Sequence, residues 1–289
     1  MMGLLVRTAR KIRRNYIPNN WFGLPFARAA CRRMIKSMPG LEGTGVSVNI
    51  GGAGYFKVHP SLVVGTYAFE TWGSGHNSGF SQWIEACRGK KRVFDIGAHI
   101  GLYALPASRV IDPTGCLYAF EPGNTNRAFL EQHVAYNQIR TIAVVPDLVG
   151  DEQKTGIPFF EAAAVHGMNT MAKESVANKK DQQFHRTLKN QICLDDFCRE
   201  HDIVPEVIKI DVEGGEYNVF QGAREVFKRA HPLIFLSVHP AHLTQLGSSV
   251  AQLYNLIHDL GYSAYTTEGR QVSELKKEEY ILSHESMKA

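Results

Sequence analysis

Short apolar runs that alternate with helical segments constrain the fold of this chain more than any other feature. Strands are predicted over residues 93–96, 116–122, 141–147, 206–214 and 232–240. The nearly continuous apolar run in EVIKIDVEG is typical of a strand that is buried on both faces. Strands that alternate with helices pack as a mostly parallel sheet with helices on both faces. We therefore predict an α/β fold.

Helical patterns and turns fill the gaps between these strands. One helix is predicted to end at Gly89 and another to begin near Gly101. Four further helices are predicted over residues 124–138, 194–202, 216–230 and 250–261. Two late strands are predicted over residues 263–267 and 279–283. Residues 150–190 show no clear helix. We predict three regions: a basic helical extension (1–45), a cap or linker (46–84) and the α/β domain (85–289).

Composition excludes several classes of protein. The chain has 289 residues, of which 44% are hydrophobic and 21% charged, as in ordinary globular proteins. No stretch reaches the 18 or more apolar residues of a membrane-spanning helix. The five cysteines form no C-x-x-C pair, which argues against a disulfide framework or a cysteine-based zinc site. This usage fits a reducing compartment, so we expect a cytoplasmic protein.

Positive charge is concentrated at the N-terminus. Residues 1–41 hold nine Lys and Arg residues and no acid, whereas the whole chain has 32 basic and 28 acidic residues, so the body is mildly acidic. That body gives no support to nucleic-acid binding. The basic segment predicts a helical cap on the body or on a second subunit, a helix on an anionic membrane surface, or a targeting peptide. A homodimer and peripheral membrane contact therefore stay open.

A glycine-containing loop follows the first predicted strand. Asp95, Gly97 and Gly101 lie in DIGAHIG, between that strand and a helix. Glycines let the backbone approach a ligand closely, and a helix N-terminus offers free N–H groups. Glu121 ends the next strand, where a carboxylate can accept hydrogen bonds from two ribose hydroxyls. Asp147 ends a third strand, where an acid could accept a hydrogen bond from an adenine amino group.

The charge of Asp95 narrows the choice of cofactor. A dinucleotide-binding loop has its first glycine at this position, and a carboxylate there would repel a pyrophosphate. S-adenosylmethionine carries a ribose, an adenine, an ammonium and a sulfonium, and no phosphate. The electrostatics therefore favour S-adenosylmethionine over a nicotinamide dinucleotide.

Four segments, in order, resemble the FkbM family of S-adenosylmethionine-dependent methyltransferases. They are VFDIGAHIGLYALPAS, YAFEPGNTNRAFLEQHVAYN, ICLDDFC and VIKIDVEGGEYNVFQGA, and the resemblance covers roughly residues 85–285. It implies a class I methyltransferase fold with a seven-stranded, mostly parallel sheet, and methyl transfer to a hydroxyl. By motif, the resemblance implies that Asp95, Gly97, Ala98 and Gly101 form the methionine-side loop and that Glu121 is the ribose acid. We assign the neighbouring His99 and Pro122 to the same cofactor site.

This sequence departs from the family pattern at two positions. His99 stands where the family more often has Asn, and Ser237 stands where an acid is more usual. The second departure concerns the acceptor side of the site.

Candidate groups for the methyl acceptor lie after the fourth and fifth predicted strands. Asp211 and Glu213 would share a strand face with Lys209, and a Lys–acid pair would keep the acids ionised. His239 could act as a general base near neutral pH, and could equally cap a turn beside Pro240. We predict Asp211, Glu213 and His239 as catalytic residues.

Two further features concern the substrate. We predict Glu216, Lys209 and His166 as substrate-binding residues, although Glu216 could simply favour the start of a helix and His166 could be a surface-loop residue. Asp211, Glu213 and His239 could also hold Mg²⁺ or another divalent ion that orients a hydroxyl.

The combined prediction is an S-adenosylmethionine-dependent O-methyltransferase acting on a hydroxyl of a small molecule, natural product or glycan. Three alternatives stay open. They are an N-methyltransferase on the same fold, a nicotinamide-dependent oxidoreductase, and a membrane- or partner-docking protein with a relic cofactor site.

Overall fold

The computed structural model describes residues 43–63, 68–162, 165, 167, 169–172 and 184–284. The predictions for residues 1–42 and for His166 lie outside these residues. The chain divides into two compact units. One contains residues up to Trp72 together with Glu131–Ile139, and the other contains Gly73–Leu130 and Arg140 onward. The domain boundaries predicted at residues 45 and 84 stay predictions.

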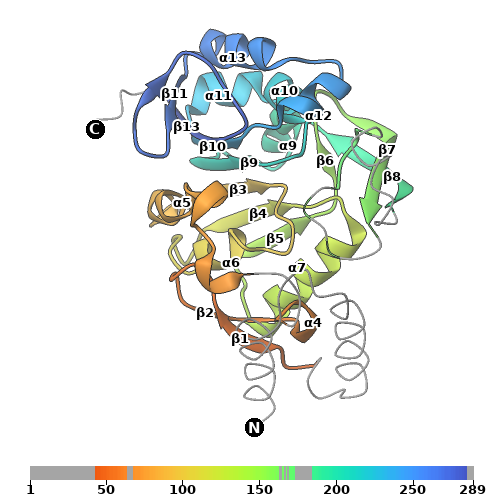
Figure 1. Cartoon of the computed structure of the whole chain (residues 1–289), viewed down its shortest axis with the longest axis vertical. Coiled ribbons are helices and arrows are strands. Elements are labelled where there is room, and N and C mark those ends of the chain that lie inside the picture. Colours follow the sequence, from red (N-terminus) through yellow and green to blue (C-terminus); the bar gives the residue numbers. More distant parts are fainter. Residues whose placement is uncertain are drawn as a thin grey trace, which may run out of the picture. The chain divides into compact units, whose positions relative to one another are not determined.

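A central sheet of eight strands organises the second unit (Figure 1). The strand order is β12-β11-β13-β10-β9-β3-β4-β5. The strands are β3 (Arg92–Ile96), β4 (Cys116–Phe120), β5 (Ile142–Val145), β9 (Val207–Ile210), β10 (Leu233–Ser237), β11 (Ser263–Thr266), β12 (Gln271–Val272) and β13 (Glu279–Ser283). Five neighbouring strands of this order, β10-β9-β3-β4-β5, pair in parallel. In contrast, β13 is antiparallel to both β10 and β11. The predicted mostly parallel sheet is confirmed, and the two-residue β12 extends the expected seven strands at one edge.

Helices cover both faces of this sheet. On one face lie α5 (Phe80–Cys87) and α6 (Ala104–Ala107), where the Trp83 ring lies 5.6 Å from that of Phe235 on β10. The other face buries Phe94, Ile208 and Ile234 in one apolar cluster. Its helices, gathered beside β9 and β10 in Figure 1, are α9 (Leu194–Glu200), α10 (Glu216–Gln221), α11 (Arg224–Ala230) and α13 (Val250–Asp259).

The single helix predicted over 216–230 is wrong, because the structure has α10 and α11 there. A Cβ at Gly222 would lie 2.0 Å from the carbonyl oxygen of Gly150, so the chain passes too close for any other residue. Asp195 then supports the second helix, since its carboxylate accepts hydrogen bonds from the backbone N–H groups of Glu225 and Val226. One acidic residue of the LDDF segment therefore has a structural role.

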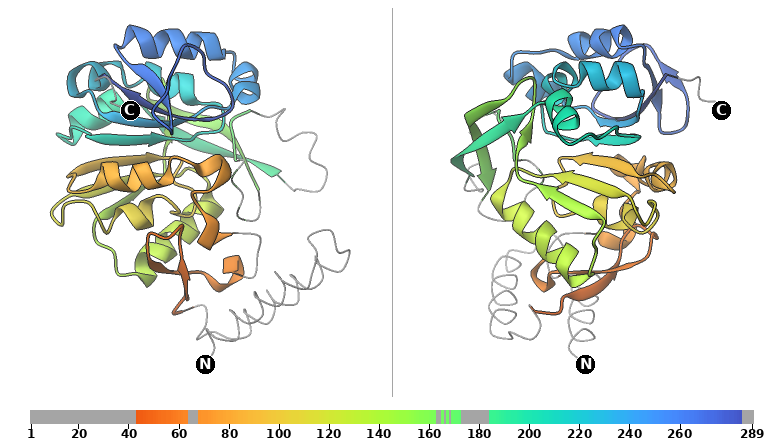
Figure 2. Two further views of the ribbon diagram at one scale, coloured as in Figure 1. Left: turned by 60° about the vertical axis from the view of Figure 1, so that its left-hand side comes forward. Right: turned by 180° about the vertical axis from the view of Figure 1, so that it is seen from behind.

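A separate three-stranded sheet occupies the segment in which no helix was predicted. It contains β6 (Leu148–Val149), β7 (Lys154–Ala162) and β8 (Phe184–Ile192), in the order β6-β8-β7. Figure 2 shows β7 and β8, in green to teal, as a long antiparallel pair set apart from the central sheet. We call this pair the β7–β8 arm.

The first unit is small. A hairpin of β1 (Val46–Asn49) and β2 (Tyr55–Val58) is followed by α4 (Pro60–Val63) and the 3-10 turn η1 (Phe69–Thr71). The last part of α7 (Asn124–Tyr136) belongs to this unit, where His133 is buried and its Nε2 accepts a hydrogen bond from the backbone N–H of His59. Two elements of the second unit complete the description, the 3-10 turn η2 (Gly75–Asn77) and the helix α12 (Pro240–Gln245).

Within the part of the chain that the structure describes, no helix is both long and apolar enough to cross a membrane. The four cysteines of that part are all free thiols.

Candidate active site

The loop after β3 brings the carboxyl ends of three strands together. Gly97 has a φ of +88°, and a Cβ on it would lie 1.9 Å from the carbonyl oxygen of Asp211. The backbone N–H groups of Gly97 and Ala98 donate to the carbonyl oxygen of Phe120, and that of Asp211 donates to Ile96. The ends of β3, β4 and β9 therefore meet around a glycine that no other residue can replace without displacement.

Glu121, which follows β4, is fixed by backbone donors. Its Oε2 accepts a hydrogen bond from the N–H of His99 (2.8 Å), and its Oε1 accepts one from the N–H of Gly123 (2.8 Å). Burial raises the pKa of Glu121 to about 7, although these hydrogen bonds act in the opposite direction. The Asn126 side chain also hydrogen-bonds to this carboxylate. A carboxylate has about four lone-pair positions, so Glu121 can still accept from a hydroxyl group.

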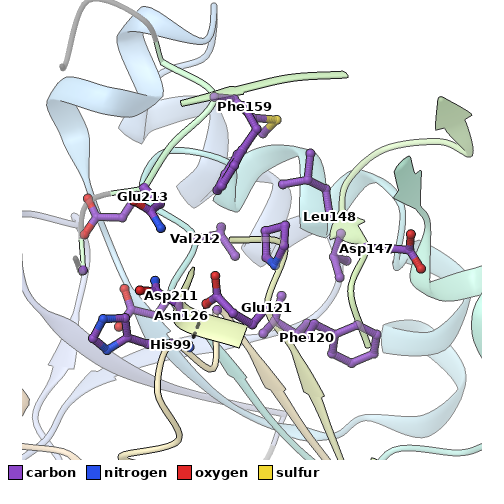
Figure 3. A pocket seen from close by; sticks show the side chains of 17 residues that line it. His99, Phe120, Glu121, Asn126, Asp147, Leu148, Phe159, Asp211, Val212 and Glu213 are labelled. Carbon is purple, nitrogen blue, oxygen red and sulfur yellow. Dashed lines mark hydrogen bonds between the residues drawn. The ribbon is translucent and has the colours of Figure 1, made fainter. Parts of the chain in front are cut away.

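A cavity lies over these strand ends, with about 570 Å³ of empty space that includes open solvent at its mouth. Figure 3 shows Glu121 between Asp147 at one end and Glu213 at the other. Of the residues predicted from the sequence, those lining the cavity are Gly97, His99, Glu121, Pro122, Asp147, Asp211 and Glu213. The structure thus brings together candidates from four separate segments. Burial raises the pKa of Asp147, while the charge of Arg127 opposes that rise.

The other predicted site residues that the structure describes do not line this cavity. Ala98 and Gly101 lie within the loop, where Gly101 has a φ of +90°. Asp95 is buried on β3 beside its sheet neighbour Lys209 on β9. Burial raises the pKa of Asp95 to about 6, an effect that the charge of Lys209 reduces.

Lys209 holds Asp211 in place. Its Nζ donates to Asp211 Oδ2 at 2.8 Å and lies 4.4 Å from the centre of the Tyr103 ring. Burial acts to lower the pKa of Lys209, but the carboxylates of Asp211, Asp95 and Glu279 raise it above its ordinary value. Burial acts to raise the pKa of Asp211, and the charges of Lys209 and His239 outweigh it, so that pKa is lowered. The predicted Lys–acid pair is therefore present, with Asp211 ionised.

His239 lies among three carboxylates. Its Nδ1 lies 2.6 Å from Oε1 of the buried Glu216, while its Nε2 faces Asp211 Oδ1 at 3.8 Å and Glu213 Oε1 at 3.6 Å. Burial acts to lower the pKa of His239, but the hydrogen bond with Glu216 and the nearby acids raise it to about 9. Burial in turn raises the pKa of Glu216, against the effect of His239.

Several side chains of the site were not predicted from the sequence. His242 on α12 places Nδ1 3.0 Å from Glu213 Oε2. Asn169 lines the cavity, accepts a hydrogen bond from the N–H of Ala162, and leaves its buried Nδ2 without a hydrogen-bond partner. Asn126, Phe159 and Met171 also line the cavity. Asn126 and His242 lie within helices, and the other three lie in β7 or between β7 and β8, so position at a strand end could not reveal them.

Comparison with solved structures finds methyltransferases at low sequence identity. FkbM methyltransferase from Methylobacillus flagellatus is 15% identical with a TM-score of 0.42, and the match covers 88% of this chain and 60% of that one. This chain thus spans less than two thirds of that protein's length. Fibrillarin from Aeropyrum pernix, solved with S-adenosyl-L-methionine, is 14% identical with a TM-score of 0.39, over 68% of this chain and 67% of that one.

A further solved structure is the precorrin-6y C5,15-methyltransferase from Geobacter metallireducens. It is 16% identical with a TM-score of 0.39, and the match covers 71% of this chain and 86% of that one. No curated protein sequence matches this chain significantly.

The family comparison covers both the glycine loop and the acidic cluster. The family model of the methyltransferase FkbM domain matches residues 95–264, which is more than half of the chain. That range begins at Asp95, within β3, and contains Glu121, Asp211 and His239. The chain therefore belongs to the FkbM family of S-adenosylmethionine-dependent methyltransferases.

Proposed function

We propose that this protein is an O-methyltransferase that moves a methyl group to a hydroxyl of a small molecule, natural product or glycan. The observation that supports a hydroxyl acceptor is the pair of carboxylates, Asp211 and Glu213, that line the cavity at the end opposite Asp147 and lie close to His239. A hydroxyl is a weak nucleophile until its proton is removed, and these two carboxylates supply oxygen atoms that can accept that proton.

The residues of the cavity fit S-adenosylmethionine. Glu121 can accept hydrogen bonds from both ribose hydroxyls, and Asp147 can accept one from an adenine amino group. Gly97 leaves room where any side chain would collide with Asp211. The unpartnered Nδ2 of Asn169 is a donor available to a ligand in the same cavity.

The chemistry divides between the cofactor and the protein. When bound, S-adenosylmethionine supplies a methyl carbon whose bond to sulfur breaks as the acceptor oxygen bonds to it, the electron pair remaining on sulfur. The protein holds the acceptor in line and provides a destination for its hydroxyl proton. Asp211 and Glu213, whose carboxylates line the cavity, can accept a hydrogen bond from that hydroxyl.

Replacing Glu121 by glutamine tests the cofactor site. Hydrogen bonds to a charged group contribute about 1.5–3 kcal/mol, so Glu121→Gln should weaken binding of S-adenosylhomocysteine roughly 10- to 150-fold. Isothermal titration calorimetry measures this directly and requires no knowledge of the acceptor.

A matched control removes the same charge elsewhere. Glu200 is exposed at the end of α9, and Glu200→Gln should bind S-adenosylhomocysteine as the unmodified protein does. Equal affinity in the Glu121→Gln variant and the unmodified protein would reject Glu121 as the ribose acid.

Cofactor affinity should also depend on pH through Glu121. Its pKa is raised to about 7 by burial, so the carboxylate predominates above pH 7 and the neutral acid below it. The ionised fraction falls about tenfold between pH 8 and pH 6, and the affinity for S-adenosylhomocysteine should fall with it, by up to about tenfold. Calorimetry across this range should show the decrease in the unmodified protein, and Glu121→Gln should remove it. The same pH profile in both proteins would contradict the assignment.

A further inference from the structure

We propose that Asp211, Glu213 and His239 form a binding site for one divalent cation of the Mg²⁺/Mn²⁺ class. Among the described residues, these three are a group of His, Asp and Glu that each offer one atom to a common point, all within 4.8 Å of one another. Atoms bound about 2.1 Å from one octahedral ion lie about 3.0–4.2 Å apart. The distances from His239 Nε2 to Asp211 Oδ1 (3.8 Å) and to Glu213 Oε1 (3.6 Å) fall in this range.

The other polar atom of each proposed ligand lies close to a neighbouring side chain. Asp211 Oδ2 accepts a hydrogen bond from Lys209, Glu213 Oε2 lies 3.0 Å from His242 Nδ1, and His239 Nδ1 lies 2.6 Å from Glu216 Oε1. Only the atoms that face one another are left to take a common ligand. Partners of this kind orient the ligands of metal sites, and a carboxylate bound to the second nitrogen of a histidine is a recurrent example.

Buried negative charge at this place provides a second, independent observation. Glu216 is fully buried, and its second oxygen, Oε2, has no hydrogen-bond partner. A buried carboxylate is costly unless positive charge lies close to it. Three carboxylates surround His239. Only one of these three, that of Asp211, also forms an ion pair with Lys209. A divalent cation on His239 Nε2 would place two positive charges among these carboxylates.

The site is open to the cavity. The side chains of Asp211, Glu213 and His239 are 31%, 17% and 15% exposed, and the first two line the cavity. In Figure 3, Asp211 and Glu213 lie at the end away from Asp147. A cation there would keep coordination positions for oxygen atoms of the acceptor. This role rests on the proposed methyl transfer: bound to the cation, the acceptor hydroxyl would have a lower pKa, and its proton would pass more easily to water.

Binding of Mn²⁺ to the full chain tests the proposal without an acceptor. Electron paramagnetic resonance, which measures free Mn²⁺, should show one bound ion per chain, displaced by excess Mg²⁺. Pulsed electron paramagnetic resonance should detect the signal of a nitrogen nucleus bound to Mn²⁺. This signal should be absent in His239→Gln. Glu213→Gln should weaken binding at least about tenfold, and Glu216→Gln, which removes an orienting partner, about 10- to 100-fold.

Two further measurements make the outcome decisive. Asp196→Asn, which removes one acidic charge from α9, a helix with no residue in the lining of the cavity, should bind Mn²⁺ as the unmodified protein does. The far-ultraviolet circular dichroism spectrum of each variant shows whether it is folded, and the unmodified protein is also titrated with S-adenosylhomocysteine. If the unmodified protein binds Mn²⁺ no more tightly than Glu213→Gln, or shows no nitrogen signal, the cation site is wrong. If the unmodified protein does not bind S-adenosylhomocysteine, the proposed function is overturned instead. The Mn²⁺ result would then stand by itself.

Discussion

Replacing Gly97 by alanine is expected to abolish detectable cofactor binding and to lower the free energy of unfolding by about 2–6 kcal/mol. A φ of +88° is strained for any residue with a Cβ, at a cost of about 1–3 kcal/mol. The added Cβ would also lie 1.9 Å from the carbonyl oxygen of Asp211, and such overpacking costs about 1–3 kcal/mol more. To relieve the collision, the ends of β3 and β9 must separate, which displaces both the cofactor loop and Asp211.

A second glycine separates strain from collision. Gly269 has a φ of +84°, but a Cβ there would meet no atom within 4 Å. Gly269→Ala should therefore show only the strain, about 1–2 kcal/mol, and should bind S-adenosylhomocysteine normally. Urea denaturation and calorimetry on the two variants measure both effects. Equal destabilisation by the two substitutions would show that the approach of Asp211 to Gly97 is not what requires a glycine.

The central sheet could be predicted from the sequence because its strands carry a strong signal. β3 and β9 are almost wholly buried, and their apolar runs stand out against the helices between them. The β7–β8 arm carries no such signal. In β7 the first three residues are exposed, and β8 alternates irregularly between exposed and buried positions, so neither resembles a core strand. What makes them strands is their pairing with each other, which depends on contacts distant in sequence.

The site was predictable where chemistry follows a strand end. Glu121, Asp147 and Asp211 come directly after or shortly after parallel strands, whose carboxyl ends share one edge of the sheet. His242 is different, because it comes from a helix whose approach depends on Gly214. A Cβ on Gly214 would lie 2.6 Å from the Cβ of His242. The sequence shows the glycine but not what fills the space beside it.

Replacing Glu161 by leucine should destabilise the second unit by about 3–5 kcal/mol, because it leaves Lys189 buried without its partner. Both side chains are buried, with Lys189 Nζ 3.0 Å from Glu161 Oε1. Glu161 Oε2 also accepts a hydrogen bond from the N–H of Asn124, the first residue of α7. Glu161 thus connects the β7–β8 arm to the helix that follows Glu121. The arm carries Phe159, which lines the cavity, so binding of S-adenosylhomocysteine should weaken as well.

Two comparisons isolate the buried pair. The double variant Glu161→Leu/Lys189→Met removes both charges, and should recover much of the stability that Glu161→Leu loses, because an apolar pair of similar volume can replace a buried ion pair. Lys154 and Glu152 form an exposed pair near the start of the same arm, and Lys154→Met should change stability little. Urea denaturation measures the free energy of unfolding of the unmodified protein and of these three variants. If the double variant is less stable than Glu161→Leu alone, the loss comes from the hydrogen bonds and packing of Glu161 and not from the uncompensated charge of Lys189.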